Sequence, residues 1–231
     1  MKDTGFLVQM HLHTAETSRC ARVGGRAMAR ACRDAGYDLI VVTDHFFNAN
    51  IACDPRLPWP QKVEILFAGY REARFEGDRI GLEVLAGWET NTFGREYLTY
   101  GLDEAFLLAN PDIARVSWRE YIDRVHAAGG FVAHAHPYRE ADYILPFEPD
   151  EYGLDAVEVL NGRHMVPRYD EKAARFAKKW KLPGIAGADA HAAIHVFDGA
   201  MRFPYPVHTA GEIFRAIARG DGEIVRDLHN R

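Results

Sequence analysis

The chain alternates between short, continuous runs of apolar residues and longer amphipathic stretches. The apolar runs have the length of strands, and most of them lack the polar/apolar alternation of a half-exposed strand. Continuous apolar runs are typical of strands that are buried on both faces, as in parallel sheets. We therefore predict parallel strands at residues 6–10, 39–42, 84–86, 131–133, 157–160 and 185–188.

Helical periodicity fills the intervals between these runs. Apolar residues recur at spacings i, i+3, i+4 and i+7, and glycine or proline residues end most of these stretches. The predicted helices lie at residues 28–35, 63–70, 118–125, 173–180 and 210–218. Alternation of strands and helices over the whole chain predicts a parallel α/β fold, with one domain over residues 1–231. Residues 141–152, rich in proline and acid, are expected to form a long loop.

Ionisable side chains stand at the carboxyl ends of the predicted strands. His11 and His13 end the first run at positions i and i+2, so both imidazoles point to the same side of the strand. In a closed or nearly closed barrel of about seven strands, all the carboxyl ends surround one opening, where active sites form. An open sheet would spread them along a line, so we favour the barrel. Similar residues end most of the later runs, namely Asp44, His45, Glu89, His136, Asp189 and His191. Glu158 lies within the run at 157–160, with Asn161 and His164 just after it.

This recurrence indicates a metal site. A single His-x-His pair or a strand-end acid is weak evidence, since each is commonly an ordinary structural feature. Buried charges are costly unless they are paired or bind a metal, so repeated ionisable strand ends need a reason. Imidazole and carboxylate ligands suit zinc, manganese or iron, and a carboxylate can bridge two ions. The core set of predicted ligands is His11, His13, Glu89, His136 and Asp189.

The order of these motifs resembles the PHP family, named for polymerase and histidinol phosphatase. The motifs are His-x-His-Thr at 11–14, Thr-Asp-His at 43–45, Gly-x-Glu at 87–89, His-Pro at 136–137, Glu-x-x-Asn at 158–161 and Asp-x-His at 189–191. The resemblance implies a distorted (βα)7 TIM-like barrel with a cluster of two or three divalent ions. It also implies that Glu89 bridges the first ion to a second one, which His136 and His164 complete. The first ion would be bound by His11, His13, Glu89 and Asp189.

The resemblance places a third ion on His45 and His191, with one ligand from the loop after His13. Many family members have a histidine or aspartate seven or eight residues after the first motif histidine, where this chain has Ser18 and Arg19. Glu16 is the nearest acid, so we expect it to be the substitute ligand.

The metal cluster predicts hydrolysis of a small phosphomonoester as the main hypothesis. A hydroxide shared by two ions would attack phosphorus, while the metals and arginines neutralise the phosphoryl oxygens. Arg139 and Arg163 lie in strand-end loops and could reach the substrate, although a solvated surface position is an equal alternative for each. Asp44 or a metal-site histidine such as His191 could protonate the leaving group, and the sequence does not choose between them.

Three other functions use the same residues. A nucleotidase or exonuclease would cleave phosphodiesters or nucleotide ends at the same metals. An amidohydrolase also begins with His-x-His, but it needs a strand-end lysine that this sequence lacks. A non-catalytic, metal-stabilised module is the remaining alternative. Specificity is expected to reside in the loops at 46–61, 91–96 and 141–152.

The composition of the chain argues against some classes of binding partner. The formal charge of −5 disfavours long nucleic acid, which usually binds to a basic surface. No run approaches the ~20 apolar residues that span a bilayer, and no secretory signal is recognisable. The three cysteines, Cys20, Cys32 and Cys53, form no CxxC pair and are expected to be packing residues. We therefore expect a cytoplasmic protein with a small phosphorylated substrate and no membrane partner; the sequence does not determine its oligomeric state.

Overall fold

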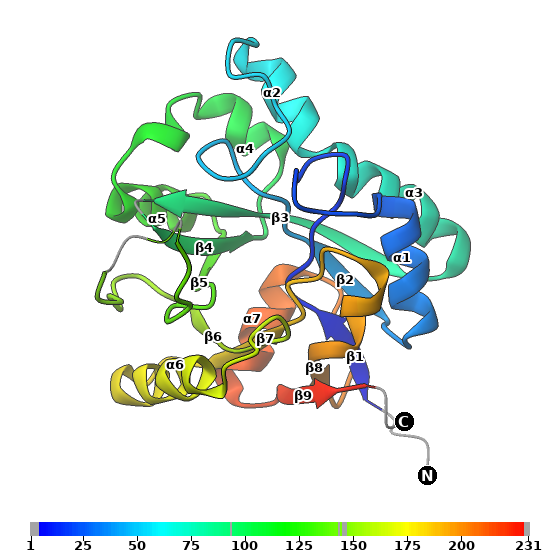
Figure 1. Ribbon diagram of the computed structural model, residues 1–231, viewed down its shortest axis with the longest axis vertical. Helices are drawn as coiled ribbons and strands as arrows, with labels where there is room; N and C mark the ends of the chain where they lie inside the picture. Colours follow the sequence, from blue (N-terminus) through cyan, green and yellow to red (C-terminus); the bar gives the residue numbers. More distant parts are fainter. Residues whose placement is uncertain (1–4, 93, 143, 145–146, 229–231) are drawn as a thin grey trace.

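A curved sheet of nine strands forms the centre of the computed structural model, which describes residues 5–92, 94–142, 144 and 147–228 (Figure 1). The strand order across the sheet is β7-β6-β5-β4-β3-β2-β1-β8-β9. The strands are β1 (Phe6–Gln9), β2 (Leu39–Val42), β3 (Glu83–Thr92), β4 (Arg95–Tyr100), β5 (Phe131–His134), β6 (Ala156–Asn161), β7 (Gly184–Gly187), β8 (Asp198–Phe203) and β9 (Glu223–Asp227).

Helices surround this sheet, with α1 and α3 on one flank, α5 on the opposite flank, and α6 and α7 at the lower end in Figure 1. The α-helices are α1 (Gly25–Asp34), α2 (Trp59–Leu66), α3 (Ala68–Ile80), α4 (Glu104–Ala109), α5 (Trp118–Ala127), α6 (Pro167–Trp180) and α7 (Ala210–Arg219). Short 3-10 segments occur at Ile113–Arg115 and Ala193–Phe197. In the described part of the chain, every helix is too short or too polar to span a lipid bilayer.

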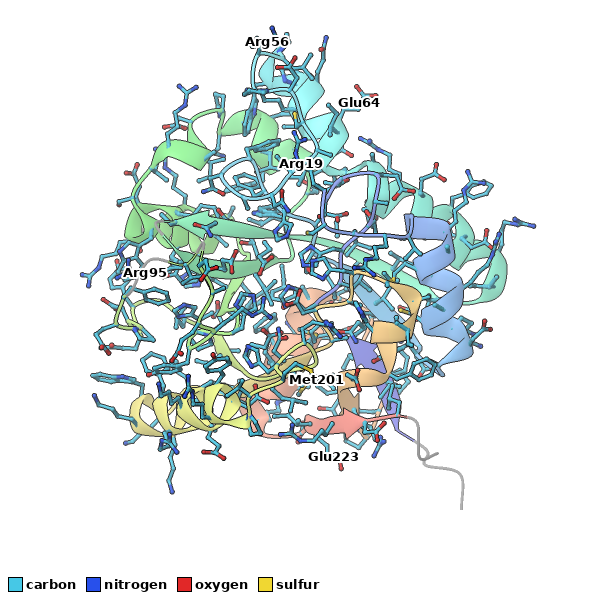
Figure 2. All side chains as sticks on the ribbon, viewed as in Figure 1. Arg19, Arg56, Glu64, Arg95, Met201 and Glu223 are labelled. Carbon is cyan, nitrogen blue, oxygen red and sulfur yellow. The ribbon has the colours of Figure 1, made fainter. Side chains whose placement is uncertain are left out.

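Two parallel blocks, β1-β2-β3 and β5-β6-β7, make up most of the sheet. β4 joins them by pairing antiparallel with both β3 and β5. The residues that follow β1 and β7 pair through an isolated parallel bridge between Leu12 and Ala190. There the His13 N–H donates to the Ala190 carbonyl over 2.9 Å. Met201 of β8 packs beside β7, with its Sδ 3.2 Å from the Ala186 nitrogen (Figure 2). The sheet therefore closes almost completely into a barrel.

The six strands predicted from apolar runs are all present, and the α/β class is confirmed. The exact (βα)7 count is not confirmed, because β4, β8 and β9 pair antiparallel and β4 follows β3 directly as a hairpin. Residues 91–96, expected to be a loop, contain the ends of both hairpin strands. The helix predicted at 63–70 is broken at Phe67 into α2 and α3. In the expected loop at 141–152, residues 143, 145 and 146 lie outside the described residues.

The barrel interior changes from apolar to polar along the strands. At the end of the barrel that α7 covers, Val8, Leu39 and Ile185 pack with Phe214 of that helix. The side chain of Tyr100 also lies in this cluster, and its hydroxyl donates to the Met10 carbonyl over 3.1 Å. The residue after Met10 is His11, just beyond the end of β1, so this apolar cluster forms the floor beneath the ionisable side chains.

Helix α3 packs tightly against the loop after β1, and this contact needs Gly69. A Cβ added there would overlap the Thr14 Oγ1 and lie 2.7 Å from the Asp44 Oδ2. We expect Gly69→Ala to lower the free energy of unfolding by about 1–3 kcal/mol, as overpacking does. The matched control is Gly211→Ala in α7, where the nearest atom belongs to the flexible Arg215 side chain and alanine should be neutral or stabilising. Equal urea unfolding midpoints for the two variants would contradict this packing.

Candidate metal centre

The site contains two sharp backbone turns. His136 and Asp189 follow β5 and β7 with φ values of 27° and 49°, a region that residues other than glycine rarely adopt. Such conformations cost about 1–3 kcal/mol each and persist where surrounding structure holds them. Both turns direct their side chains to one place, since His136 Nε2 lies 3.0 Å from Glu89 and Asp189 Oδ1 lies 3.2 Å from His13.

The carboxylate of Glu89 lies among four imidazoles. Its Oε1 is 3.0 Å from His136 Nε2 and 3.5 Å from His11 Nε2. Its Oε2 is 3.0 Å from His45 Nδ1 and 3.5 Å from His13 Nε2. Burial alone would raise the pKa of Glu89, but His11 and the contacts with His136 and His45 outweigh it and hold the pKa well below its usual value. Glu89 is therefore a buried anion that faces several metal-binding nitrogens.

Asp189 supplies the second carboxylate of this cluster. Its Oδ1 lies 3.2 Å from His13 Nε2 and 3.5 Å from both His11 Nε2 and His191 Nδ1. Its Oδ2 accepts a short hydrogen bond from the Arg139 guanidinium. Burial acts to raise the pKa of Asp189, yet Arg139 and His11 keep the pKa well below its usual value.

Three groups of these side chains could each hold a divalent ion. Within each group, one ligand atom per residue lies within 4.8 Å of the others. The donors are imidazole nitrogen and carboxylate oxygen atoms, which suit zinc, manganese and iron, and all of the residues but the partly exposed His191 are buried. The groups border a cavity of about 610 Å³, so a substrate could reach them. The groups are His11, His13 and Asp189; His11, Glu89 and His136; and His13, His45 and His191.

Carboxylates behind the imidazoles fix their orientation. The Nδ1 of His11 lies 2.9 Å from the Glu158 Oε1, which leaves Nε2 directed at the cluster. The Glu158 Oε2 accepts hydrogen bonds from the His136 backbone nitrogen and from Asn161 Nδ2, each at 2.9 Å. Histidines that bind metals usually donate their second ring N–H to such a partner. Although burial acts to lower the pKa of His11, the carboxylates of Glu158, Asp189 and Glu89 raise it well above its usual value.

The structure brings together most residues in the predicted ligand set, but it leaves His164 outside the three groups. The Nδ1 of His164 is 2.7 Å from Asp170 Oδ1, and its Nε2 is 3.5 Å from Arg139 Nε. Arg139 contacts both His164 and Asp189, and the His164 ring packs edge-on against the ring of His136, with the centroids 6.4 Å apart. The predicted ligands that the structure does bring together are His11, His13, His45, Glu89, His136, Asp189 and His191.

Glu16 does not reach the histidines, contrary to the expectation for the third group. Its two carboxylate oxygens accept hydrogen bonds from the Gly25 backbone nitrogen at 2.9 and 3.1 Å. Glu16 thus binds the amino terminus of α1, where a negative charge is favourable because of the helix dipole.

Cys20 lies in the cavity wall instead of acting only as a packing residue. Its Sγ is 3.2 Å from His45 Nε2. Burial acts to raise the pKa of Cys20, but hydrogen bonds from His191 and His45 lower the pKa to about 6. It stands nine residues after His11, one residue beyond the expected ligand positions, but this spacing alone does not distinguish it from Glu16.

Asp44 anchors the loop after β1. Its Oδ1 accepts from the Thr14 nitrogen and from Ser18 Oγ, each at 2.6 Å, and its Oδ2 accepts from Thr14 Oγ1. Burial raises the pKa of Asp44 to about 6, even though these hydrogen bonds act to lower it. Asp44 does not line the cavity, so its geometry supports a structural role rather than proton transfer to a substrate.

The other proposed catalytic residues differ in position. Arg139 and His191 line the cavity. Arg163 is exposed and is not among the lining residues; its backbone nitrogen donates to Asn161 Oδ1 over 2.9 Å. Glu96 lines the cavity from β4, with Oε2 3.6 Å from His136 Nδ1. Sequence patterns missed Glu96, because β4 was not recognised as a strand.

The carboxyl-terminal part of the chain matches a known family. Residues 167–221 match the model of the PHP-associated family, and this segment extends from α6 to α7 and includes Asp189 and His191. The barrel is also shared with solved PHP-like structures. The resemblance to the PHP family is therefore confirmed. No curated protein matches this PHP-like chain.

Solved structures share the fold at low sequence identity. A two-domain protein from Bacteroides vulgatus, which contains a predicted PHP-like metal-dependent phosphoesterase, has a TM-score of 0.72 and 15% identity over 97% of this chain. An amidohydrolase from Chromobacterium violaceum with bound sulfate has a TM-score of 0.58 and 15% identity, covering 95% of this chain and 97% of its own. A lesion-specific endonuclease from Pyrococcus furiosus has a TM-score of 0.64 and 13% identity over 96% of this chain. The PHP-like chain spans 65% of the Bacteroides protein and 58% of the endonuclease.

The position of Glu16 predicts a structural effect without loss of metal. We expect Glu16→Ala to lower the free energy of unfolding by about 1–2 kcal/mol, since it removes a charged partner of the α1 terminus. Metal content, measured by elemental analysis, should not change. The control is Glu64→Ala on the exposed face of α2 (Figure 2), which should alter neither quantity. Loss of one ion from Glu16→Ala would restore Glu16 as a ligand.

Proposed function

We propose that this chain is a metal-dependent phosphoric ester hydrolase whose substrate is a small phosphomonoester. The observation that carries the proposal is the carboxylate of Glu89, buried among four imidazoles beside a cavity that Arg139 also lines. Buried ionisable groups at this density are costly unless they bind metals. Fold neighbours whose names include a metal-dependent phosphoesterase and an endonuclease support the same class of reaction. We further propose that residues 1–231 act as one PHP-like barrel domain.

The contacts support one division of the ligands. His11 occurs in two groups, but its Nδ1 faces Glu158, so only its Nε2 is left to bind one ion. We assign His11 and His13 to a first ion with Asp189, and His136 to a second ion, with Glu89 shared between the two. His45 and His191 then remain for a third ion. His164, whose ring packs against that of His136, would join the second group through its Nε2, which now lies 3.5 Å from Arg139 Nε.

The protein side chains prepare the cavity for a phosphoryl group. When bound, divalent ions supply an activated water and neutralise phosphoryl oxygens. Arg139 lies at the cavity wall, and its guanidinium already contacts the carboxylate of Asp189. A guanidinium can donate two parallel hydrogen bonds to phosphate, so Arg139 would orient the substrate. His191 is more exposed than His45 and also lines the cavity.

A nucleotide end or a phosphodiester is the second candidate substrate. The same ligand groups would serve it, and one protein with this fold is a lesion-specific endonuclease. The formal charge of −5 favours the small phosphomonoester over long nucleic acid.

A substrate panel tests the proposed function directly. The protein is purified without chelator, its metals are counted by elemental analysis, and it is assayed with zinc, manganese or iron. The panel contains a phosphomonoester, a phosphodiester, nucleotides and an amide. We expect bound ions and preferential release of phosphate from the monoester. Faster diester cleavage would favour the second candidate, and the absence of phosphoric ester hydrolysis with every metal would overturn the proposal.

Arg139 and Arg163 allow a matched comparison. We expect Arg139→Ala to lower kcat/KM by about 10- to 100-fold, because charged hydrogen bonds contribute about 1.5–3 kcal/mol. Arg163→Ala should change kcat/KM less than about twofold, as its side chain does not line the cavity. Elemental analysis should show that both variants keep their metals. An equal effect of the two substitutions on kcat/KM would contradict the role of Arg139.

Glu89 is expected to be shared between ions, so its amide variant should affect more than one of them. We predict that Glu89→Gln loses more than one ion per chain, because an amide cannot replace the shared anion. Glu76→Gln is the control, since Glu76 is a buried glutamate on α3 that contacts Arg30 away from the cavity. It should keep the wild-type metal content. A full complement of metal in purified Glu89→Gln would refute the shared position.

A further inference from the structure

The loop after β1 leaves the third histidine group without its expected ligand. Glu16 is bound to the α1 terminus. Ser18 Oγ donates to Asp44 over 2.6 Å and accepts from the His45 backbone nitrogen over 3.0 Å. The Nε of Arg19 donates to the Ile51 carbonyl over 2.8 Å. Ser18 Oγ also lies 3.4 Å from His13 Nδ1. None of these contacts is to a ring nitrogen of His45 or His191.

Two imidazoles are oriented toward Cys20. The Nδ1 of His45 faces the Glu89 carboxylate at 3.0 Å, and its Nε2 faces Cys20 Sγ at 3.2 Å. The Nδ1 of His191 is 2.8 Å from the Asp189 carbonyl oxygen, and its ring lines the same cavity as Cys20. His191 therefore has one ring nitrogen on a carbonyl and the other available to bind, which is the usual arrangement of metal-binding histidines.

We propose that Cys20 binds the third ion as a thiolate, together with His45 and His191. This inference rests on the proposed metal-dependent function and identifies a ligand of the same site. The other two cysteines have different surroundings, since Cys32 is buried in the apolar cluster of α1 and the Cys53 thiol donates to the Asp54 carbonyl.

A thiolate changes which metal this position prefers. Soft sulfur ligands select zinc over manganese, whereas sites of nitrogen and oxygen accept both. The third position would therefore prefer zinc, while the groups around Glu89 and Asp189 remain compatible with manganese or iron. A mixed-metal centre follows, in which one ion differs from the other two in how easily it is exchanged.

Cobalt substitution tests the ligand by spectroscopy. Cobalt bound to a thiolate gives a sulfur-to-metal charge-transfer band in the near ultraviolet, which nitrogen and oxygen ligands do not give. We expect the band in cobalt-loaded wild type and in the control Cys53→Ala, and its loss in Cys20→Ala together with about one ion per chain. Cobalt-loaded wild type without the band, or Cys20→Ala that keeps it, would overturn the proposal.

A second measurement uses wild-type protein, so it does not depend on the folding of a variant. Iodoacetamide labelling of Cys20 is followed by peptide mass spectrometry, before and after zinc is added to chelator-treated protein. We expect zinc to slow alkylation of Cys20 by at least about tenfold, because a bound thiolate is a poorer nucleophile. Equal alkylation rates with and without zinc would overturn the assignment of Cys20 as a ligand.

The two proposals fail in different ways. Hydrolysis of the substrate panel without the charge-transfer band would overturn Cys20 as a ligand and would still support the phosphoesterase proposal. The band without hydrolysis would support Cys20 as a ligand and remove the enzymatic proposal. Failure of wild type to bind any cobalt or zinc would overturn both.

Discussion

The carboxylate of Glu89 cannot be buried among imidazoles unless positive charge surrounds it. At 1% exposure it has almost no contact with water, and Coulomb interactions in such surroundings are strong. Protonated histidines could neutralise it, but His13 has a pKa well below its usual value because of burial and of its neighbours His45 and His191. Because the pKa of His11 is raised and that of His13 is lowered, the imidazoles around Glu89 are not all charged at once. Divalent ions would satisfy the carboxylate and the neutral imidazoles together, and our account of the site follows from this constraint.

The barrel is built to bring that charge to one place. Strand ends from both parallel blocks meet over an apolar floor, and β4 connects the blocks while adding Glu96 to the wall. Glycine permits the closest approach, because a Cβ at Gly187 would overlap His11 and lie 2.6 Å from Glu158. The strained backbones of His136 and Asp189 complete the convergence. These strained conformations lower stability locally, and the surrounding structure holds the candidate ligands in position.

Apolar runs could be predicted as strands because burial on both faces leaves a continuous pattern in the sequence. His11 and His13 could be predicted because they follow the end of β1. Glu89 could be predicted because it follows an apolar run, although it lies inside β3, which continues to Thr92. Glu96 could not, because an antiparallel hairpin strand carries a different pattern. Glu16 and Cys20 lie in a loop, whose path depends on contacts distant in sequence, such as Asp44 with Ser18. Sequence spacing alone therefore could not show which of the two faces the histidines.

Anomalous X-ray scattering tests the central claim most directly. Crystals of protein purified without chelator would be measured on both sides of the absorption edges of zinc, iron and manganese. The account predicts anomalous peaks between Glu89 and the surrounding imidazoles, within ~2.0–2.2 Å of the nitrogen and carboxylate oxygen atoms. Well-ordered side chains without any such peak, together with a guanidinium of Arg139 still bound to Asp189, would contradict it.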